Sequence, residues 1–83
     1  MSAEAARLRE MLIGLIEPLI DQPDEARVEA EDKGHTVVVR VCVQPRDMGK
    51  VIGRGGVRAQ AIRKLMKAYG NTIRRRVIVD IAD

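Results

Sequence analysis

Aromatic side chains are almost absent from this sequence. Its 83 residues include one tyrosine, Tyr69, and neither phenylalanine nor tryptophan. Proteins that hold single-stranded nucleic acids by stacking bases on aromatic rings gain roughly 1–3 kcal/mol per stacked base. A platform of aromatic rings is therefore excluded as the main way in which this chain gains affinity for a ligand.

The residues that carry most covalent catalysis and metal binding are equally rare. Cysteine, histidine and serine occur once each. So few groups leave no nucleophile–base pair and no cluster of ligands, so we expect no enzyme, no cofactor and no metal site. Cys42 is expected to be a small apolar residue. His35 lies beside a predicted turn and is expected to be a polar loop residue.

Long apolar runs are missing as well. No stretch approaches the ~20 apolar residues of a membrane span. The run at residues 11–16 is too short for one and has charges on both sides, which also argues against a cleavable signal. With a single cysteine, no internal disulfide is possible. We therefore expect a protein of the reducing cytoplasm.

Charge is abundant and unevenly distributed. Charged residues make up 33% of the chain and apolar residues 46%, the balance of one small globular domain over residues 1–83. Residues 1–44 carry 5 basic and 9 acidic side chains, whereas residues 45–83 carry 10 basic and 3 acidic ones. The second half is therefore suited to face a polyanion, although a merely solvated basic surface fits the charge equally well.

Hydrophobic periodicity predicts a first helix over about residues 3–20. Ser2 is placed to cap its start. Apolar residues recur at helical spacing at Leu8, Leu12, Leu15, Ile16 and Leu19. Pro18 has no N–H to donate to the carbonyl four residues earlier, so a kink or a separate last turn is expected there. The polar residues 21–24 then end the helix.

Three segments alternate in the manner of β-strands. Residues 26–31 and 35–44 lie on either side of a predicted turn at residues 32–34, and residues 77–81 form a last strand. One face of the second strand is made entirely of valine, at Val37, Val39, Val41 and Val43. Such β-branched side chains suit a pleated sheet with one buried face.

A glycine-rich turn at residues 53–56 separates two further predicted helices, at residues 47–52 and 57–69. Asp47 is expected to cap the first of these, and the Gly-Asn pair at 70–71 to stop the second. Glycine permits positive φ and leaves backbone N–H groups uncovered, and the following helix adds the positive end of its dipole. The turn therefore predicts an anion site, for which nucleic-acid phosphate fits the basic half best.

The helix predicted at residues 57–69 is apolar over an unusually wide arc. About a third of its circumference is polar, with Gln60, Arg63, Lys64 and Lys67. Apart from Arg58, the remaining arc is apolar and holds Val57, Ala59, Ala61, Ile62, Leu65, Met66, Ala68 and Tyr69. This exceeds the ~100° stripe that covers a sheet. The excess either faces a ligand groove or a partner, or needs neither because three of these residues are alanine. We predict a dimer contact at Ala61, Leu65 and Ala68.

The order α-β-β-α-α-β, with the glycine turn between the last two helices, resembles a KH domain of type II. Residues 50–56 look like the I-G-x-x-G loop of that family, with Gly53 and Gly56 as its fixed glycines. The family usually has a large aliphatic residue where Ala59 stands, and Ile62 is placed to supply that bulk. The resemblance covers essentially the whole chain and is greatest to the small stand-alone bacterial KH proteins of the KhpA type. It implies an α+β fold whose three-stranded sheet has its helices packed on one face.

This resemblance implies recognition of short single-stranded RNA, because a KH loop clamps about four nucleotides. The residues expected to contact RNA are Lys50, Ile52, Gly53, Arg54, Gly55, Gly56, Arg58 and Ala59. The amides of residues 54–56 are expected to meet phosphates, with charge attraction from Lys50, Arg54 and Arg58. Ile52 and Ala59, with an edge of the second strand, are expected to line a groove for bases. Residues 74–76 either extend the phosphate track or form a solvated tether.

The resemblance also implies partners and a cellular role. An RNA chaperone or a post-transcriptional regulator is expected, which self-associates as a homodimer or pairs with a larger, KhpB-like multidomain protein that contains a KH domain. An alternative interpretation remains open. In it the chain is a protein-interaction or dimerisation module of a larger RNA-binding complex and binds RNA only weakly by itself.

Overall fold

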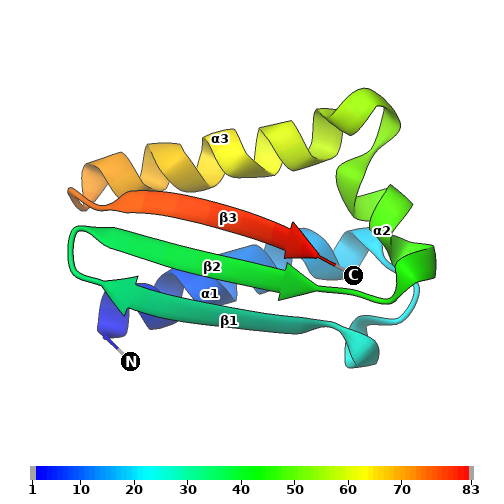
Figure 1. Ribbon diagram of the computed structural model, residues 1–83, viewed down its shortest axis with the longest axis horizontal. Coiled ribbons are helices and arrows are strands. Elements are labelled where there is room, and N and C mark those ends of the chain that lie inside the picture. The colour runs from blue at the N-terminus through cyan, green and yellow to red at the C-terminus, as the bar shows by residue number, and fades with distance from the viewer. Residues whose placement is uncertain (1, 83) are drawn as a thin grey trace.

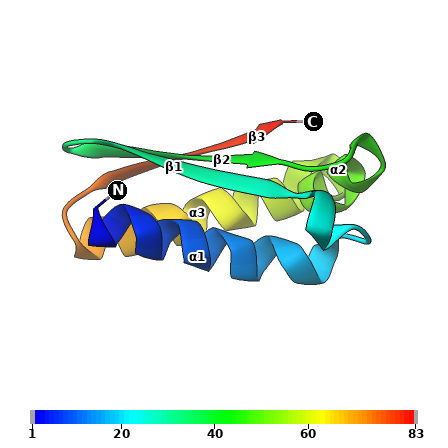
Figure 2. The same cartoon turned by 90° about the horizontal axis from the view of Figure 1, so that it is seen from below.

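The protein folds as a three-stranded sheet with two long helices on one face (Figures 1 and 2). The structure is a computed structural model that describes residues 2–82. Its helices and strands, in chain order, are α1 (Ala3–Ile16), β1 (Arg27–Lys33), β2 (Thr36–Cys42), α2 (Pro45–Ile52), α3 (Val57–Thr72) and β3 (Arg76–Ala82). The predicted α+β class and the order α-β-β-α-α-β are confirmed.

Helix α1 begins and ends for reasons that the sequence contains. The Ser2 hydroxyl accepts a hydrogen bond from the Ala5 amide at 3.0 Å and so caps the first turn. Leu8, Leu12 and Ile16 are buried against the sheet. The α-helix stops at Ile16, and a separate 3₁₀ turn at Glu17–Leu19 carries Pro18 near its start. The predicted separate last turn at this proline is confirmed.

Strand β2 is the central strand of a mixed sheet. The strand order is β1-β2-β3, with β1 antiparallel and β3 parallel to β2. The four valines of the predicted inner face are all buried, and the helices cover this face while the other stays open (Figure 2). The strands keep their predicted places with shifted ends, since β1 continues to Lys33 and the hairpin turns at Gly34 and His35. A central strand has both edges paired, so the prediction that an edge of β2 borders the groove is wrong.

Helix α3 runs three residues beyond its predicted end. It continues through Gly70 to Thr72, because Gly70 serves packing rather than termination. A Cβ on Gly70 would lie 2.6 Å from Val77 Cγ2 and 2.7 Å from the Arg75 carbonyl oxygen. The missing side chain therefore lets the end of α3 lie directly against the start of β3.

Asp47 has a different role from the predicted one. Helix α2 begins at Pro45, and Gln44 is its N-cap residue. Asp47 lies in the first turn and is fully buried, where its carboxylate accepts hydrogen bonds from the amides of Asp21 and Gln22, each at 3.1 Å. The carboxylate thus joins α2 to the segment that follows α1. None of the helices described in residues 2–82 has the length and apolar content that a bilayer crossing requires.

Candidate nucleic-acid interface

Three glycines in the turn between α2 and α3 adopt backbone conformations that favour glycine. Their φ angles are 77° at Gly53, 65° at Gly55 and 79° at Gly56, in the region that residues with a Cβ rarely enter. At Gly53 space is also limiting, because a Cβ there would lie 2.8 Å from Arg58 Cγ and 3.0 Å from the Arg58 amide nitrogen. The turn therefore keeps its backbone bare where α3 begins.

Two backbone amides of this turn are free to bind a ligand. The Gly53 amide donates to the Gly49 carbonyl at 2.9 Å, and the Gly56 amide donates to the Gly53 carbonyl at 3.0 Å. The amides of Arg54 and Gly55 donate to no acceptor within residues 2–82. The Gly56 N–H closes the turn itself, so the amides of Arg54 and Gly55 are the ones left open to a phosphate, and the part predicted for the Gly56 amide stays a prediction.

The three cations predicted to attract phosphate differ in their freedom. Arg58 Nη1 donates to the Lys50 carbonyl at 2.8 Å and so holds the first turn of α3 against the end of α2. Lys50 Nζ pairs with Asp21 and lies 3.9 Å from Asp47 Oδ1. Arg54 is exposed at the tip of the turn and has no ion pair among the described residues. Arg54 is thus the cation that is free to meet a ligand.

The two apolar residues predicted to line a groove also differ. Ile52 is 37% exposed, whereas Ala59 is 3% exposed and packed beneath the surface. Val57, which the sequence did not single out for this role, is 63% exposed at the start of α3. The apolar surface next to the glycine turn therefore comes from Ile52 and Val57, and Ala59 supports it from below.

A groove runs between α3 and the free edge of β3. It has a volume of about 290 Å³ and is lined by Arg63, Lys67, Arg76, Val77, Ile78 and Val79; we refer to it as the α3–β3 groove. Strand β3 pairs with β2 through its even-numbered residues, since the Arg76 amide donates to the His35 carbonyl and the Ala82 carbonyl accepts from the Val43 amide. The odd-numbered residues therefore turn their N–H and C=O groups to the free edge. Arg63 Nε donates to one of these carbonyls, that of Val79, at 3.4 Å.

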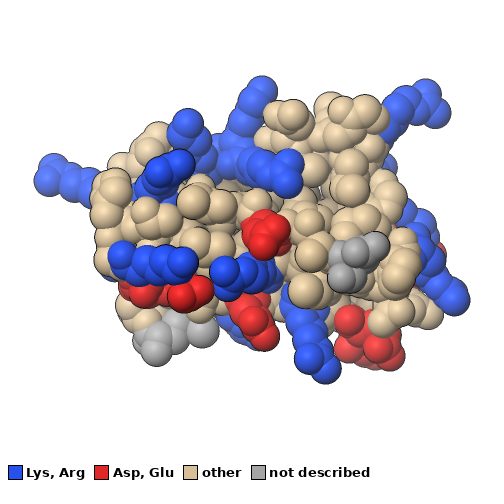
Figure 3. Space-filling view, in the orientation of Figure 1, with Lys and Arg blue, Asp and Glu red and all other residues tan. Residues whose placement is uncertain are grey.

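A second hollow continues this groove at the end of α3. Its volume is about 310 Å³, and it is lined by His35, Lys67, Asn71, Arg74, Arg75 and Arg76; we call it the turn pocket. Lys67 and Arg76 line both hollows, and no carboxylate belongs to the described lining of either. In Figure 3 the region over α3 and the upper edge of the sheet carries basic side chains, and the acidic ones lie at the centre and below.

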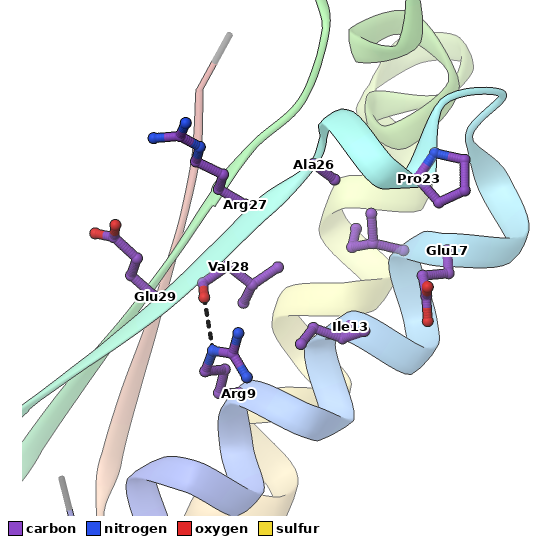
Figure 4. A pocket seen from close by; sticks show the side chains of 9 residues that line it. Arg9, Ile13, Glu17, Pro23, Ala26, Arg27, Val28 and Glu29 are labelled. Atoms are coloured by element: carbon purple, nitrogen blue, oxygen red, sulfur yellow. Dashed lines mark hydrogen bonds between the residues drawn. The ribbon is translucent and has the colours of Figure 1, made fainter.

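A third hollow, larger than the α3–β3 groove and the turn pocket, lies at the opposite edge of the sheet. It has a volume of about 400 Å³ between α1, the turn at Pro23–Glu25 and β1 (Figure 4). Arg9 Nε donates to the Val28 carbonyl across it at 2.8 Å. Its charges balance, because Arg9 and Arg27 are matched by Glu17 and Glu29. A cavity without net charge does not suit a polyanion, so the glycine turn and the α3–β3 groove are the candidate interface.

Comparison with known proteins agrees with this geometry. The profile of the KhpA/KhpB KH-domain family matches residues 9–81. The chain belongs to this family. RNA-binding protein KhpA of Halalkalibacterium halodurans is 45% identical over 65 residues, which cover 78% of this chain and 86% of that protein. RNA-binding protein KhpA of Bacillus subtilis is 36% identical over 76 residues, which cover 92% of this chain and 94% of that protein. The predicted resemblance to the KhpA type is confirmed.

Two solved structures contain the same fold as about a third of a longer chain. A variant of Era from Aquifex aeolicus, bound to GDP and AlF4⁻, superposes with a TM-score of 0.68 at 14% identity. The match covers 99% of this chain and 32% of that one. Era in complex with a nucleotide and nucleotides 1506–1542 of 16S ribosomal RNA gives a TM-score of 0.66 at 17% identity over 98% of this chain. At these identities the likeness establishes the fold alone.

The position of β3 beside the α3–β3 groove was not predicted from the sequence. Arg63 and Lys67 lie one helical turn apart, and from their spacing alone they were predicted only to form the polar side of a helix. The wall opposite them is an edge strand, whose position depends on sheet order. The spacing of Arg63, Lys67 and Arg76 was a usable signal, because a helix that packs on the next strand brings its last turns close to the start of that strand.

Proposed function

We propose that the protein binds short single-stranded RNA, with phosphates at the glycine turn and bases along the α3–β3 groove. The observation that carries this proposal is that one helix, α3, begins at a turn with two free amides, at Arg54 and Gly55, and further along borders a groove lined by three cations and no described carboxylate. The names of the KhpA relatives, which are RNA-binding proteins, support the ligand class.

The shape of the interface favours a single strand over a duplex. The free edge of β3 offers backbone donors and acceptors of the kind that pair with the Watson–Crick edge of an unstacked base. In a duplex that edge of the base is already paired. A turn with two free amides and one free arginine contacts few phosphates, so the slope of log K against log salt should be shallow, of order −2 to −3, given about −0.7 per phosphate.

The decisive experiment changes the glycine turn alone. We expect Arg54→Asp/Gly55→Asp to abolish binding of a short unstructured RNA, because two carboxylates replace the free arginine and repel phosphate at the free amides. A Cβ added at Gly55 would meet nothing within 4 Å, and aspartate is among the residues that tolerate the left-handed conformation held there, so the fold should persist at a modest cost in stability. Fluorescence anisotropy with single-stranded RNA and a matched duplex gives the affinity, and circular dichroism reports the fold.

A control variant should carry the same change of charge elsewhere. Arg27→Asp/Gly14→Asp places an equal change on the opposite side of the molecule, at an exposed arginine and an exposed helical glycine. This control should bind within about twofold of the unmodified protein, the remainder being long-range charge. Wild-type affinity in the folded turn variant would show that the turn is not the site. Equal binding of duplex and single strand, with a salt slope steeper than about −5, would instead contradict recognition of bases in the groove.

We further propose that the outer face of α3 mediates self-association. Ala61, Leu65 and Ala68 are exposed, and Leu65 is 50% exposed. On an ideal helix Leu65 lies roughly half a turn away from the line of Arg63 and Lys67. A dimer formed through this face therefore leaves the α3–β3 groove open, so that two RNA sites act together. The same face suits pairing with a larger KhpB-like protein.

The proposed cellular role is that of an RNA chaperone or post-transcriptional regulator in the cytoplasm. One groove of this size should bind with roughly micromolar affinity, so two sites joined in one assembly gain from effective concentration. Crosslinking in cells followed by sequencing of the bound RNA tests this role. Recovery of no RNA above the level of the turn variant would contradict it.

A further inference from the structure

The turn between α3 and β3 holds a residue in an unfavourable backbone conformation. Arg74 has a φ of 59° and is the one non-glycine residue with positive φ in residues 2–82. This conformation costs energy for any residue with a Cβ, and it persists where the surroundings impose it, often at a ligand site. The turn is fixed by the Gly70 carbonyl, which accepts from the amides of Ile73 at 3.1 Å and Arg75 at 2.9 Å.

The three consecutive arginines at this turn have different surroundings. Arg75 is 20% exposed and is bound by acceptors on two sides, at 2.8 Å from Asp32 Oδ1 and 2.8 Å from Glu4 Oε1. It also donates to the Gly34 carbonyl. Arg74 and Arg76 have no ion pair among the described residues. Arg75 therefore anchors the turn, and its two neighbours remain available to a ligand.

The turn pocket is lined by cations without any described carboxylate, whereas the cavity beside α1 has equal numbers of arginines and glutamates. Lys67, like Arg74 and Arg76, has no ion pair among the described residues, and all three line the pocket together with the amide side chain of Asn71. Like charges held close together repel one another, and an anion between them removes that repulsion. Their donors suit phosphate oxygens, since arginine offers a planar fork and lysine a point charge.

We propose that the turn pocket is a second phosphate site, separate from the glycine turn, that binds a backbone phosphate of the same RNA strand. This inference rests on the proposed function. The turn pocket shares Lys67 and Arg76 with the α3–β3 groove, so a strand that follows the groove away from the glycine turn reaches it. The helix from Val57 to Asn71 is about 21 Å long at a rise of about 1.5 Å per residue. The site therefore serves RNA longer than the segment clamped at the glycine turn.

The test compares RNA lengths in a variant that lowers the charge of the turn pocket by two. Arg74→Gly/Asn71→Asp removes one cation and adds one carboxylate at two exposed residues that line the turn pocket but not the α3–β3 groove, and glycine suits the positive φ at position 74, so the fold should be retained. We expect unchanged affinity for an RNA of about four nucleotides. For an RNA of about ten nucleotides we expect at least about tenfold weaker binding than in the unmodified protein. The salt slope for the longer RNA should become shallower by about 0.7 per lost phosphate contact.

The control Arg27→Gln/Arg40→Gln removes the same charge from outside the groove and should bind both lengths like the unmodified protein. Equal binding of the longer RNA by the turn-pocket variant and the control would overturn the proposal. Loss of affinity for the four-nucleotide RNA in the turn-pocket variant would also overturn it, because the pocket would then belong to the primary contact. Neither result depends on the glycine-turn variant Arg54→Asp/Gly55→Asp. The proposed function is contradicted only if that variant still binds RNA with the affinity of the unmodified protein.

Further arms separate a backbone phosphate from a free or terminal one. Inorganic phosphate, and four-nucleotide RNA with and without a 5′-phosphate, are titrated while the amide signals of residues 74–76 are followed by NMR. Shifts caused only by the longer RNA agree with the proposal. The opposite result is saturable shifts with inorganic phosphate, or only with the 5′-phosphorylated RNA, while the longer RNA binds no more tightly than the four-nucleotide RNA. That result would show a site for free or terminal phosphate and would overturn the assignment to a backbone phosphate.

Discussion

Single glycines at the two ends of α3 decide how closely this helix approaches its neighbours. Gly53 makes room for the side chain of Arg58 where the helix begins, and Gly70 lies against Val77 near its end. At Gly70 one of the two closest atoms is the Arg75 carbonyl oxygen, which belongs to the backbone and yields less readily than a flexible side chain. Gly53 thus allows the close contact between the glycine turn and the first turn of α3, and Gly70 allows the close contact between α3 and β3.

We predict that Gly70→Ala destabilises the protein by about 1–3 kcal/mol, because the added methyl group forces α3 and β3 apart. The matched control is Gly14→Ala in α1, where an added Cβ meets nothing within 4 Å. This control should be stabilising by about 0.5–1 kcal/mol, the helix-propensity difference between the two residues. Urea unfolding followed by circular dichroism measures both. Equal stabilities for Gly70→Ala and the unmodified protein would mean that the close approach contributes nothing.

Among the elements, one ion-pair network joins three that are distant in sequence. Arg75 follows α3, Asp32 lies in β1 and Glu4 lies in the first turn of α1. Asp32 also accepts hydrogen bonds from the Ser2 hydroxyl at 2.6 Å and from the Gly34 amide at 2.9 Å. The hydrogen bond from Arg75, followed by those from Ser2 and Gly34, holds the pKa of Asp32 well below its usual value. The bond to Asp32 in turn raises the pKa of Arg75.

This network predicts an acid-sensitive contribution to stability. A carboxylate whose pKa is lower in the folded state stabilises the fold above the unfolded-state pKa of about 3.9, and that contribution is lost as the pH falls through the folded-state pKa. Asp32→Asn should therefore be less stable than the unmodified protein at neutral pH, with a difference that shrinks below about pH 4. Thermal unfolding between neutral and acidic pH measures this. The control Asp24→Asn, at an exposed aspartate without an ion pair in the described chain, should show a pH-independent difference.

The elements differ in how well the sequence predicted them. The alternation of valines in β2 is typical only of a strand, and the leucine spacing in α1 only of a helix. The type and approximate position of both elements were therefore predicted correctly. Gly70 was misread because a helical glycine serves equally as a stop signal or as a packing contact, and only the neighbouring strand decides. Asp47 was misread because an aspartate early in a helix suits a cap, while its actual partners lie 25 and 26 residues away. The sheet order that places β3 at the groove is likewise a long-range property that local patterns do not contain.

For the whole molecule, the outer face of α3 predicts a dimer. We expect light scattering at micromolar concentration to give twice the monomer mass for the unmodified protein and the monomer mass for Leu65→Lys, because a buried lysine in an apolar contact must lose its hydration. The monomeric variant should keep its fold, since Leu65 is half exposed, and should bind long RNA more weakly as effective concentration is lost. Gln60→Lys, on the groove side of the same helix, should stay dimeric. A monomer mass for the unmodified protein would remove this contact from the proposal.

The parallel pairing of β2 with β3 has a consequence for the order in which the sheet assembles during folding. The β1–β2 hairpin closes through a short turn, and hairpins form in about 1–10 μs. Pairing Thr36 with Arg76 instead closes a crossover that contains α2, the glycine turn and α3, which costs more loop-closure entropy. The β1–β2 hairpin is therefore expected to form first, and β3 joins the sheet only when this crossover closes. The α3–β3 groove is thus the last feature of the sheet edge to be completed as the chain folds.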